Sequence, residues 1–470
     1  MNEKAKIYTI FASRGYGGAG GPPERLISND QLLRRLEERC GGVDFISRDL
    51  TKGFDVQSAL NELEDLRGEL DGVLIIGVTR EYRLIFTGLP TIVVYNLFEF
   101  MNIPYELFIE RGRVLTATLD RIGTTSPSIS SAMFDDLVDK IDLIRVLSRM
   151  RRSTMISISP YKYFHAVDYQ GDIHDQLPEG YNEAYTEALR ESLGVKLIRV
   201  EPAEFYDAVK EVDERDAEGI AKMWIGEAKE VKDTTEEEVV KAAKMYLAFE
   251  TLRRRYGAVA ISTHMRSLTG SGKVEDMAWP GIGIIEFQKR GLVGVCQDYP
   301  NIAATHLLGL YATGRPSMLG DLMVDTFNGV DIILHCGAPI NPHGNDRVPY
   351  TIWSHAQSPV RGTGKPGSGT GVQVDLPVDE PVTVWKLDVL NRRILLHTGI
   401  SVDGRSLYRG FDELMCRTKL VVKVEAEKVQ SRFCPGRYGI HRAATFGDLR
   451  DKVKKIATLI GFKVIEEDRS

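Results

Sequence analysis

The sequence has few cysteines and no long apolar segment. Cysteine occurs at five of 470 positions, with no Cys-x-x-Cys pair and no even number from which a disulfide framework could be built. This usage is typical of a protein kept in the reducing cytoplasm. Near the N-terminus there is only a short apolar run before Arg14, so we expect neither a signal peptide nor a membrane-spanning helix there.

An excess of one charge is also lacking. The chain has 60 basic and 66 acidic residues, mixed along its length, and a net charge of −6. Without a basic stripe, we expect no nucleic-acid partner and no attraction to an anionic membrane. The glycine-rich stretch 13–26 lacks the Gly-Lys-Ser/Thr ending of a P-loop, and no Gly-x-Ser-x-Gly elbow occurs. We therefore expect a small-molecule substrate and neither a P-loop nucleotide site nor a serine-hydrolase site.

Length and apolar rhythm predict the architecture. A chain of 470 residues is too long for a single domain with one hydrophobic core, since a domain has roughly 100–200 residues. Strand-like runs alternate with helical patterns up to about residue 330, which indicates two doubly wound α/β domains with parallel sheets. After that, short apolar runs separated by Gly/Pro turns favour a mainly antiparallel, barrel-like β domain with a final helix. We predict domains at 1–155, 156–330 and 331–470.

Asp298 is the first candidate for chemistry. It follows a predicted strand and precedes a helix in the stretch "GVCQDYPNIAATHLLGLYATG", residues 294–314. Ligands collect at the carboxyl ends of parallel strands, although an acid in this place can also simply cap the helix. Glu275 follows the preceding predicted strand and would approach the same edge. Two such acids and one histidine form an O,O,N ligand set suited to Mn²⁺ or Mg²⁺.

The histidines are scarce and concentrated late in the chain. Of nine, five fall in the last third. His335 and His343 flank the turn "HCGAPINPH", where each is either a metal ligand or a structural residue. His441 lies in a predicted loop before the last helix, with Gly436 and Gly439 nearby, and loops on rigid scaffolds commonly carry ligands. His441 is therefore the favoured nitrogen ligand.

Two segments resemble the L-fucose isomerase family and its relatives, including the arabinose isomerases. "CQDYPNIAATHLLGLYATGRPSMLGD" (296–321) is similar to the central segment of these enzymes, and "GIHRAATFGDLRDKVKKIATLIGFKVIEED" (439–468) to their C-terminal end. A third stretch, "VEDMAW" (274–279), resembles the segment that carries another acidic ligand. The resemblance covers residues 257–470. The family positions fall on Glu275 (or Asp276 or Glu286), Asp298, Asn301, Asp321, His441, Thr445 and Gly447.

This resemblance implies a metal-dependent aldose–ketose isomerase acting on an open-chain pentose or 6-deoxyhexose through a cis-enediolate. Mn²⁺, or else Mg²⁺ or Co²⁺, would be held by Glu275, Asp298 and His441. The two carboxylates would transfer the proton between C2 and C1 of the sugar. The resemblance also implies a cytoplasmic trimer or hexamer. Substrate-facing groups would be Trp279, Asn301, His335 and His343.

One departure leaves two alternatives open. Relatives often carry a glutamate next to the central aspartate or two residues before it, where this chain has Gln297 and Cys296. A sugar-binding protein of the same fold that does not turn over its ligand therefore stays in view. So does a glycosidase that uses two carboxyl groups without a metal.

Overall fold

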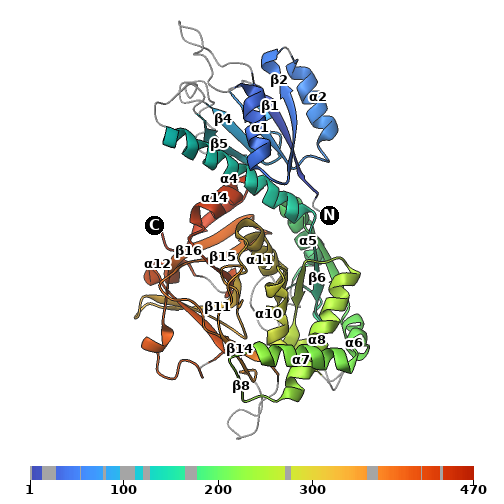
Figure 1. Ribbon diagram of the computed structural model, residues 1–470, viewed down its shortest axis with the longest axis vertical. Coiled ribbons are helices and arrows are strands. Elements are labelled where there is room, and N and C mark those ends of the chain that lie inside the picture. The colour runs from blue at the N-terminus through green and yellow to red at the C-terminus, as the bar shows by residue number, and fades with distance from the viewer. Residues whose placement is uncertain are drawn as a thin grey trace. The chain divides into compact units, whose positions relative to one another are not determined.

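The computed structural model describes residues 3–12, 28–52, 54–77, 81–95, 112–119, 127–164, 177–269, 277–356, 369–413, 415–433 and 438–469. Its elements are shown in Figure 1. The chain forms two compact units. One comprises Met1–Met150 with Asp451–Lys463, and the other comprises Arg151–Arg450 with Val464–Ser470. The second unit contains every candidate ligand named above.

The first unit is built on a five-stranded parallel sheet of order β2-β1-β3-β4-β5. The inner strand β3 is buried at every position, as expected for a strand covered on both faces. Helix α1 begins at a capping box formed by Ser28 and Gln31, and α2 begins at Asp55. The elements are β1 (Ala5–Phe11), α1 (Asn29–Arg39), β2 (Val43–Asp49), α2 (Val56–Leu66), β3 (Gly72–Ile76), α3 (Tyr82–Ile85), β4 (Thr91–Tyr95), β5 (Val114–Thr118), α4 (Pro127–Arg151) and α14 (Arg450–Ile460).

The second unit opens with another parallel sheet, of order β10-β9-β6-β7. Chain order reverses between β6 and β9, so the crevice at the carboxyl ends of these two strands is a topological switch point, where α/β proteins bind ligands. This point positions the candidate site. The strands are β6 (Thr154–Ile158), β7 (Lys196–Val200), β9 (Ala260–Thr263) and β10 (Val293–Val295).

Helices connect these strands and fill the segment 203–255, which the sequence predicts to be mostly helical. A short strand, β8 (Glu230–Lys232), interrupts that segment and pairs with β13 (Tyr350–Trp353), a contact that the charge pattern does not reveal. Helix α11 starts with Pro300 in its first turn and ends at Gly314, whose positive φ of 71° suits a glycine C-cap. The helices are α5 (Tyr181–Leu193), α6 (Pro202–Lys210), α7 (Glu214–Glu227), α8 (Glu236–Arg255), α9 (Met265–Thr269), α10 (Gly281–Lys289) and α11 (Pro300–Thr313).

The C-terminal sheet is antiparallel and closes on itself. Its order is β15-β18-β11-β12-β17-β16-β19, and β15 also pairs with β16, so the six strands from β15 to β16 form a ring. Strand β11 belongs to this sheet although it precedes residue 330. The small sheet adds β14 (Gly371–Val374) to β13. The remaining elements are β11 (Met318–Asp325), β12 (Val330–His335), β15 (Pro381–Asp388), β16 (Arg393–Val402), β17 (Thr418–Lys423), α12 (Ala426–Arg432), β18 (His441–Phe446) and β19 (Lys463–Glu466).

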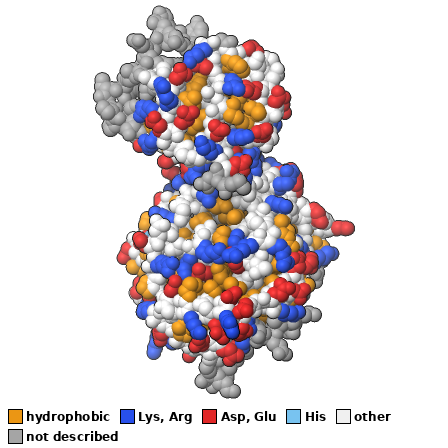
Figure 2. Space-filling model, turned by 45° about the vertical axis from the view of Figure 1, so that its right-hand side comes forward, with side chains coloured by type: hydrophobic (Ala, Val, Ile, Leu, Met, Phe, Trp, Pro, Cys, Tyr) orange, Lys and Arg blue, Asp and Glu red, His pale blue; other side chains and the backbone are white. Residues whose placement is uncertain are grey.

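The protein is thus mixed α/β, with two parallel sheets and a C-terminal antiparallel sheet, which confirms the coarse fold prediction. The division into three domains at residues 155 and 330 stays a prediction. Basic and acidic side chains are interspersed over the face drawn in Figure 2. Within the described ranges, no helix has the length and apolar character needed to cross a lipid bilayer.

Candidate metal centre

Asp298 lies at the switch point of the second parallel sheet. Its side chain is buried, and the Ser157 hydroxyl of β6 reaches its two carboxylate oxygens at 2.8 and 2.9 Å. Ser157 pairs in register with Ser262 of β9. Helix α11 has Tyr299 at its N-cap and no side-chain cap. The carboxyl group therefore faces the strand ends and does not cap the helix.

The environment of Asp298 changes its proton affinity. Burial raises the pKa of this carboxyl to about 6, and the hydrogen bonds from Ser157 act in the opposite direction. A carboxyl with this pKa exchanges a proton near neutral pH, as a general acid–base group must. The site thus has a group whose protonation can change during a reaction.

A group of possible metal ligands lies on three strands of the antiparallel sheet. Asp321 of β11 and His441, the first residue of β18, are register partners, and the His441 Nε2 atom lies 2.9 Å from Asp321 Oδ1. His335 ends the neighbouring strand β12. One donor atom from each of the three lies within 4.8 Å of the others. Gly320 permits the close strand approach, because a Cβ there would lie 2.1 Å from Ile333 Cγ2.

The donor set fits a divalent ion. With metal–ligand distances of about 2.1 Å, neighbouring donors on an octahedral ion lie about 3.0 Å apart, close to the 2.9 Å between Asp321 and His441. Both imidazoles are buried, whereas the Asp321 side chain is 26% exposed. The Tyr299 ring packs on His441 with centroids 4.4 Å apart, which fixes the imidazole from the segment that also carries Asp298. The exposed side of Asp321 gives solvent access to these donors.

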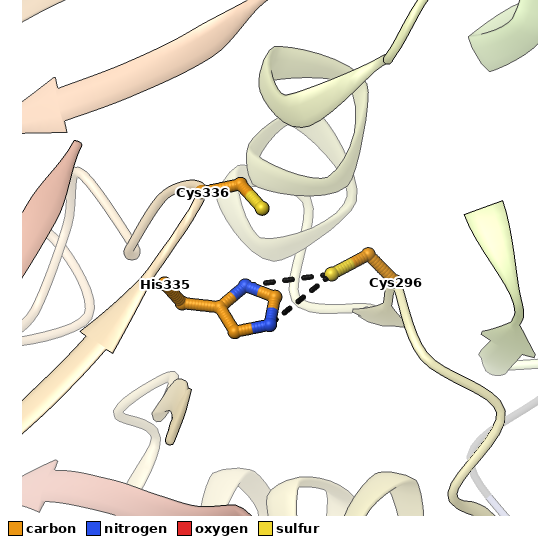
Figure 3. A group of neighbouring side chains, drawn as sticks. All are labelled: Cys296, His335 and Cys336. Carbon is orange, nitrogen blue, oxygen red and sulfur yellow. Dashed lines mark hydrogen bonds between the residues drawn. The ribbon is translucent and has the colours of Figure 1, made fainter. Parts of the chain in front are cut away.

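Two thiol groups lie beside His335. Cys336 is the next residue in the chain, and Cys296 directly follows β10. Figure 3 shows the three side chains. The Cys296 Sγ atom lies 3.4 Å from both ring nitrogens of His335, and all three residues form a second possible ligand group. They line a small cavity of about 20 Å³ together with Ile284 and Ile285 of α10. A cavity of this size holds about one water molecule.

The other predicted site residues lie as follows. Glu275 and Asp276 are outside the described residues. Glu286 of α10 accepts a hydrogen bond from the Trp224 indole at 3.1 Å and pairs with Lys289 at 2.8 Å, and it is not part of either ligand group. The pairing of Glu275 with Asp298 therefore stays a prediction.

The four residues predicted to face the substrate do not form one group in the structure. Asn301 donates from its side chain to the Leu387 carbonyl at 3.0 Å and so joins α11 to β15. Trp279 stacks on His355 with centroids 4.0 Å apart, and His343 contacts Glu380 at 3.3 Å. His335 alone of the predicted four lies in the ligand groups. Thr445 lies within β18, and its hydroxyl group lies 2.7 Å from that of Ser317.

The sequence pattern does not single out several residues of this region. No sequence motif includes Ser157, Tyr299, Cys336 or His306. His306 of α11 is buried, and burial together with its interaction with His335 holds its pKa near 3, so it stays neutral. A cross-strand contact such as Asp321 with His441 depends on register, which spacing along the chain does not encode.

No family model matches this chain, and no curated protein matches it.

Proposed function

We propose that this protein is a metal-dependent aldose–ketose isomerase acting on an open-chain pentose or 6-deoxyhexose. The observation that carries the proposal is the convergence of Asp321, His335 and His441 at metal-binding separations, in the part of the chain that resembles sugar isomerases. Asp298 at the neighbouring strand edge adds a group for proton transfer.

The ligand set in this proposal differs from the one that the resemblance implies. Asp321 and His335 stand in place of Glu275 and Asp298. Two imidazoles and one carboxylate favour Mn²⁺, Co²⁺ or Fe²⁺ over Mg²⁺, which prefers oxygen ligands. Bound there, the ion would polarise the sugar carbonyl as a Lewis acid.

The chain's own residues have separate tasks in this reaction. Isomerisation removes a proton from C2 and delivers one to C1, so it needs a group that accepts and returns a proton. Asp298 meets this need because burial raises its pKa to about 6, while Ser157 holds both carboxylate oxygens and fixes their direction. Tyr299, the next residue, keeps the His441 ring in place. Asp298 and Tyr299 are both buried, so bulk water is excluded from the proton acceptor.

The test is turnover with and without metal. The protein is dialysed against a chelator, loaded with Mn²⁺, and assayed for ketose formation from L-fucose and D-arabinose. We expect activity only in the loaded protein and a loss of at least 10²-fold in Asp321→Asn. Asp325→Asn is the matched control, because Asp325 lies on the same strand and bonds Tyr408 and Asn328.

The same assays separate the alternatives. Metal and sugar binding without ketose formation would identify a sugar-binding protein. Glycoside cleavage that is insensitive to chelator would identify a carboxylate-pair glycosidase. A second candidate follows from the two-histidine, one-carboxylate set itself, which non-haem Fe²⁺ oxygenases use. Oxygen consumption by the Fe²⁺-loaded protein, in place of isomerisation, would favour it.

A further inference from the structure

Two thiols and an imidazole gather beside the proposed centre. Cys296 follows β10, and Cys336 follows His335 at the end of β12. One donor atom from each of Cys296, His335 and Cys336 lies within 4.8 Å of the others. Cys296 Sγ is 3.4 Å from the His335 nitrogens. Figure 3 shows Cys296, His335 and Cys336 pointing toward one another.

The spacing is that of a tetrahedral metal site. For Zn–S of about 2.3 Å and Zn–N of about 2.05 Å, sulfur and nitrogen donors on one ion lie about 3.5 Å apart. The observed separation is 3.4 Å. A buried cysteine more often serves as a small apolar side chain. Cys40 illustrates that ordinary case, since it is buried in the first unit and belongs to no ligand group among the described residues.

We propose that Cys296, His335 and Cys336 form a second metal site for a thiophilic divalent ion of the zinc class. Thiolate sulfur is the ligand that selects Zn²⁺ over Mn²⁺ and Mg²⁺. Three protein donors hold a tetrahedral ion and leave its fourth position to water. Its two thiolates distinguish this site from the group of Asp321, His335 and His441.

Sharing of His335 couples the two sites. A neutral imidazole offers one nitrogen lone pair, so His335 serves either the thiols or the Asp321/His441 pair at one time. An ion of the zinc class at the thiols thus withdraws one ligand from the proposed catalytic ion. This coupling rests on the proposed function, whereas the thiol site itself does not.

The test uses Co²⁺ as a spectroscopic substitute for Zn²⁺. The chelator-treated, reduced protein is titrated with Co²⁺, and we expect a thiolate-to-cobalt charge-transfer band in the near ultraviolet that one equivalent of Zn²⁺ removes. The band should be lost in Cys336→Ser and kept in Cys40→Ser and Asp321→Asn. A wild-type protein without the band, or a band that persists in Cys336→Ser, would overturn the site.

A second measurement needs no variant. Alkylation of Cys296 and Cys336, mapped by mass spectrometry, should slow at least tenfold when Zn²⁺ is added, while Cys40 serves as the internal reference. Equal rates with and without Zn²⁺ would also overturn the site.

The coupling has its own readout. Mn²⁺ affinity, followed by the electron paramagnetic resonance of free Mn²⁺, should fall at least tenfold in the Zn²⁺-loaded protein. Unchanged Mn²⁺ affinity beside an intact cobalt band would refute the sharing of His335 and leave the thiol site standing. A cobalt band in a protein without isomerase activity would refute only the proposed function.

Discussion

Replacing Asp298 with asparagine should stabilise the metal-free protein above neutral pH while removing its activity. The pKa of this carboxyl rises from 3.8 to about 6 on folding because the group is buried. A group with a raised folded-state pKa contributes its full stability below the unfolded value and loses it as pH rises through the folded value. The stability of the wild type should therefore decline relative to Asp298→Asn between about pH 4 and pH 7.

The expected size follows from the shift. At 1.36 kcal/mol per pKa unit, a rise of about 2 units amounts to about 3 kcal/mol at pH 8, to order of magnitude. The unit that contains Asp298 has roughly 300 residues, so its unfolding entropy is about 0.6 kcal/mol/K and the Tm difference should be about 5 °C. Asparagine preserves the fold because the Ser157 hydroxyl can donate to the amide oxygen or accept from the amide nitrogen.

The assay is thermal unfolding in chelator, followed by tryptophan fluorescence at several pH values. All four tryptophans lie in the second unit, so the signal reports the unit of interest. Turnover of the Mn²⁺-loaded Asp298→Asn should fall by about 10²-fold or more. Asp325→Asn is the control and should show no gain in stability as pH rises, because hydrogen bonds, first that of Tyr408, lower the pKa of Asp325 to about 2. A pH-independent stability difference for Asp298→Asn would refute the buried, raised-pKa carboxyl, and normal turnover would refute its proton-transfer role.

Three further changes have defined outcomes. Ser157→Ala removes a hydroxyl that donates to Asp298, so the pKa of the carboxyl should rise further above 6, and an unshifted pH profile of the stability difference would contradict this. Glu467→Gln should lower the free energy of unfolding by about 3–5 kcal/mol in urea titrations, since Glu467 accepts at 2.9 Å from the fully buried His397; a loss below about 1 kcal/mol would show that the pair is dispensable. His335→Ala should weaken Mn²⁺ binding at least tenfold by equilibrium dialysis, and unaltered affinity would return His335 to the substrate-facing role that the sequence predicts.

The fold follows from local patterns more closely than the site does. Alternating apolar runs and helical segments predict the parallel sheets, and Gly/Pro turns between short runs predict the antiparallel sheet, because both signals are contained in short windows. The same reasoning singles out Asp298 at a strand end. It does not reveal that Ser157, 141 residues earlier, would hold the carboxylate.

The ligand groups depend on information that short windows lack. Asp321 meets His441 only because β11 and β18 pair in one particular register. Cys296 meets His335 only after the four-stranded and seven-stranded sheets of the second unit are packed. Glu275 lies outside the described residues, so the ligand set that the resemblance implies stays a prediction.

If both proposed sites bind metal, the order of synthesis affects which site is completed first. Synthesis proceeds from the N-terminus, and domains begin to fold as they emerge. Cys296, His335 and Cys336 have all been made before His441, the last member of the other ligand group. A nascent chain would therefore complete its thiol ligands first. On this proposal, cells with abundant free zinc should yield more of the zinc-bound form.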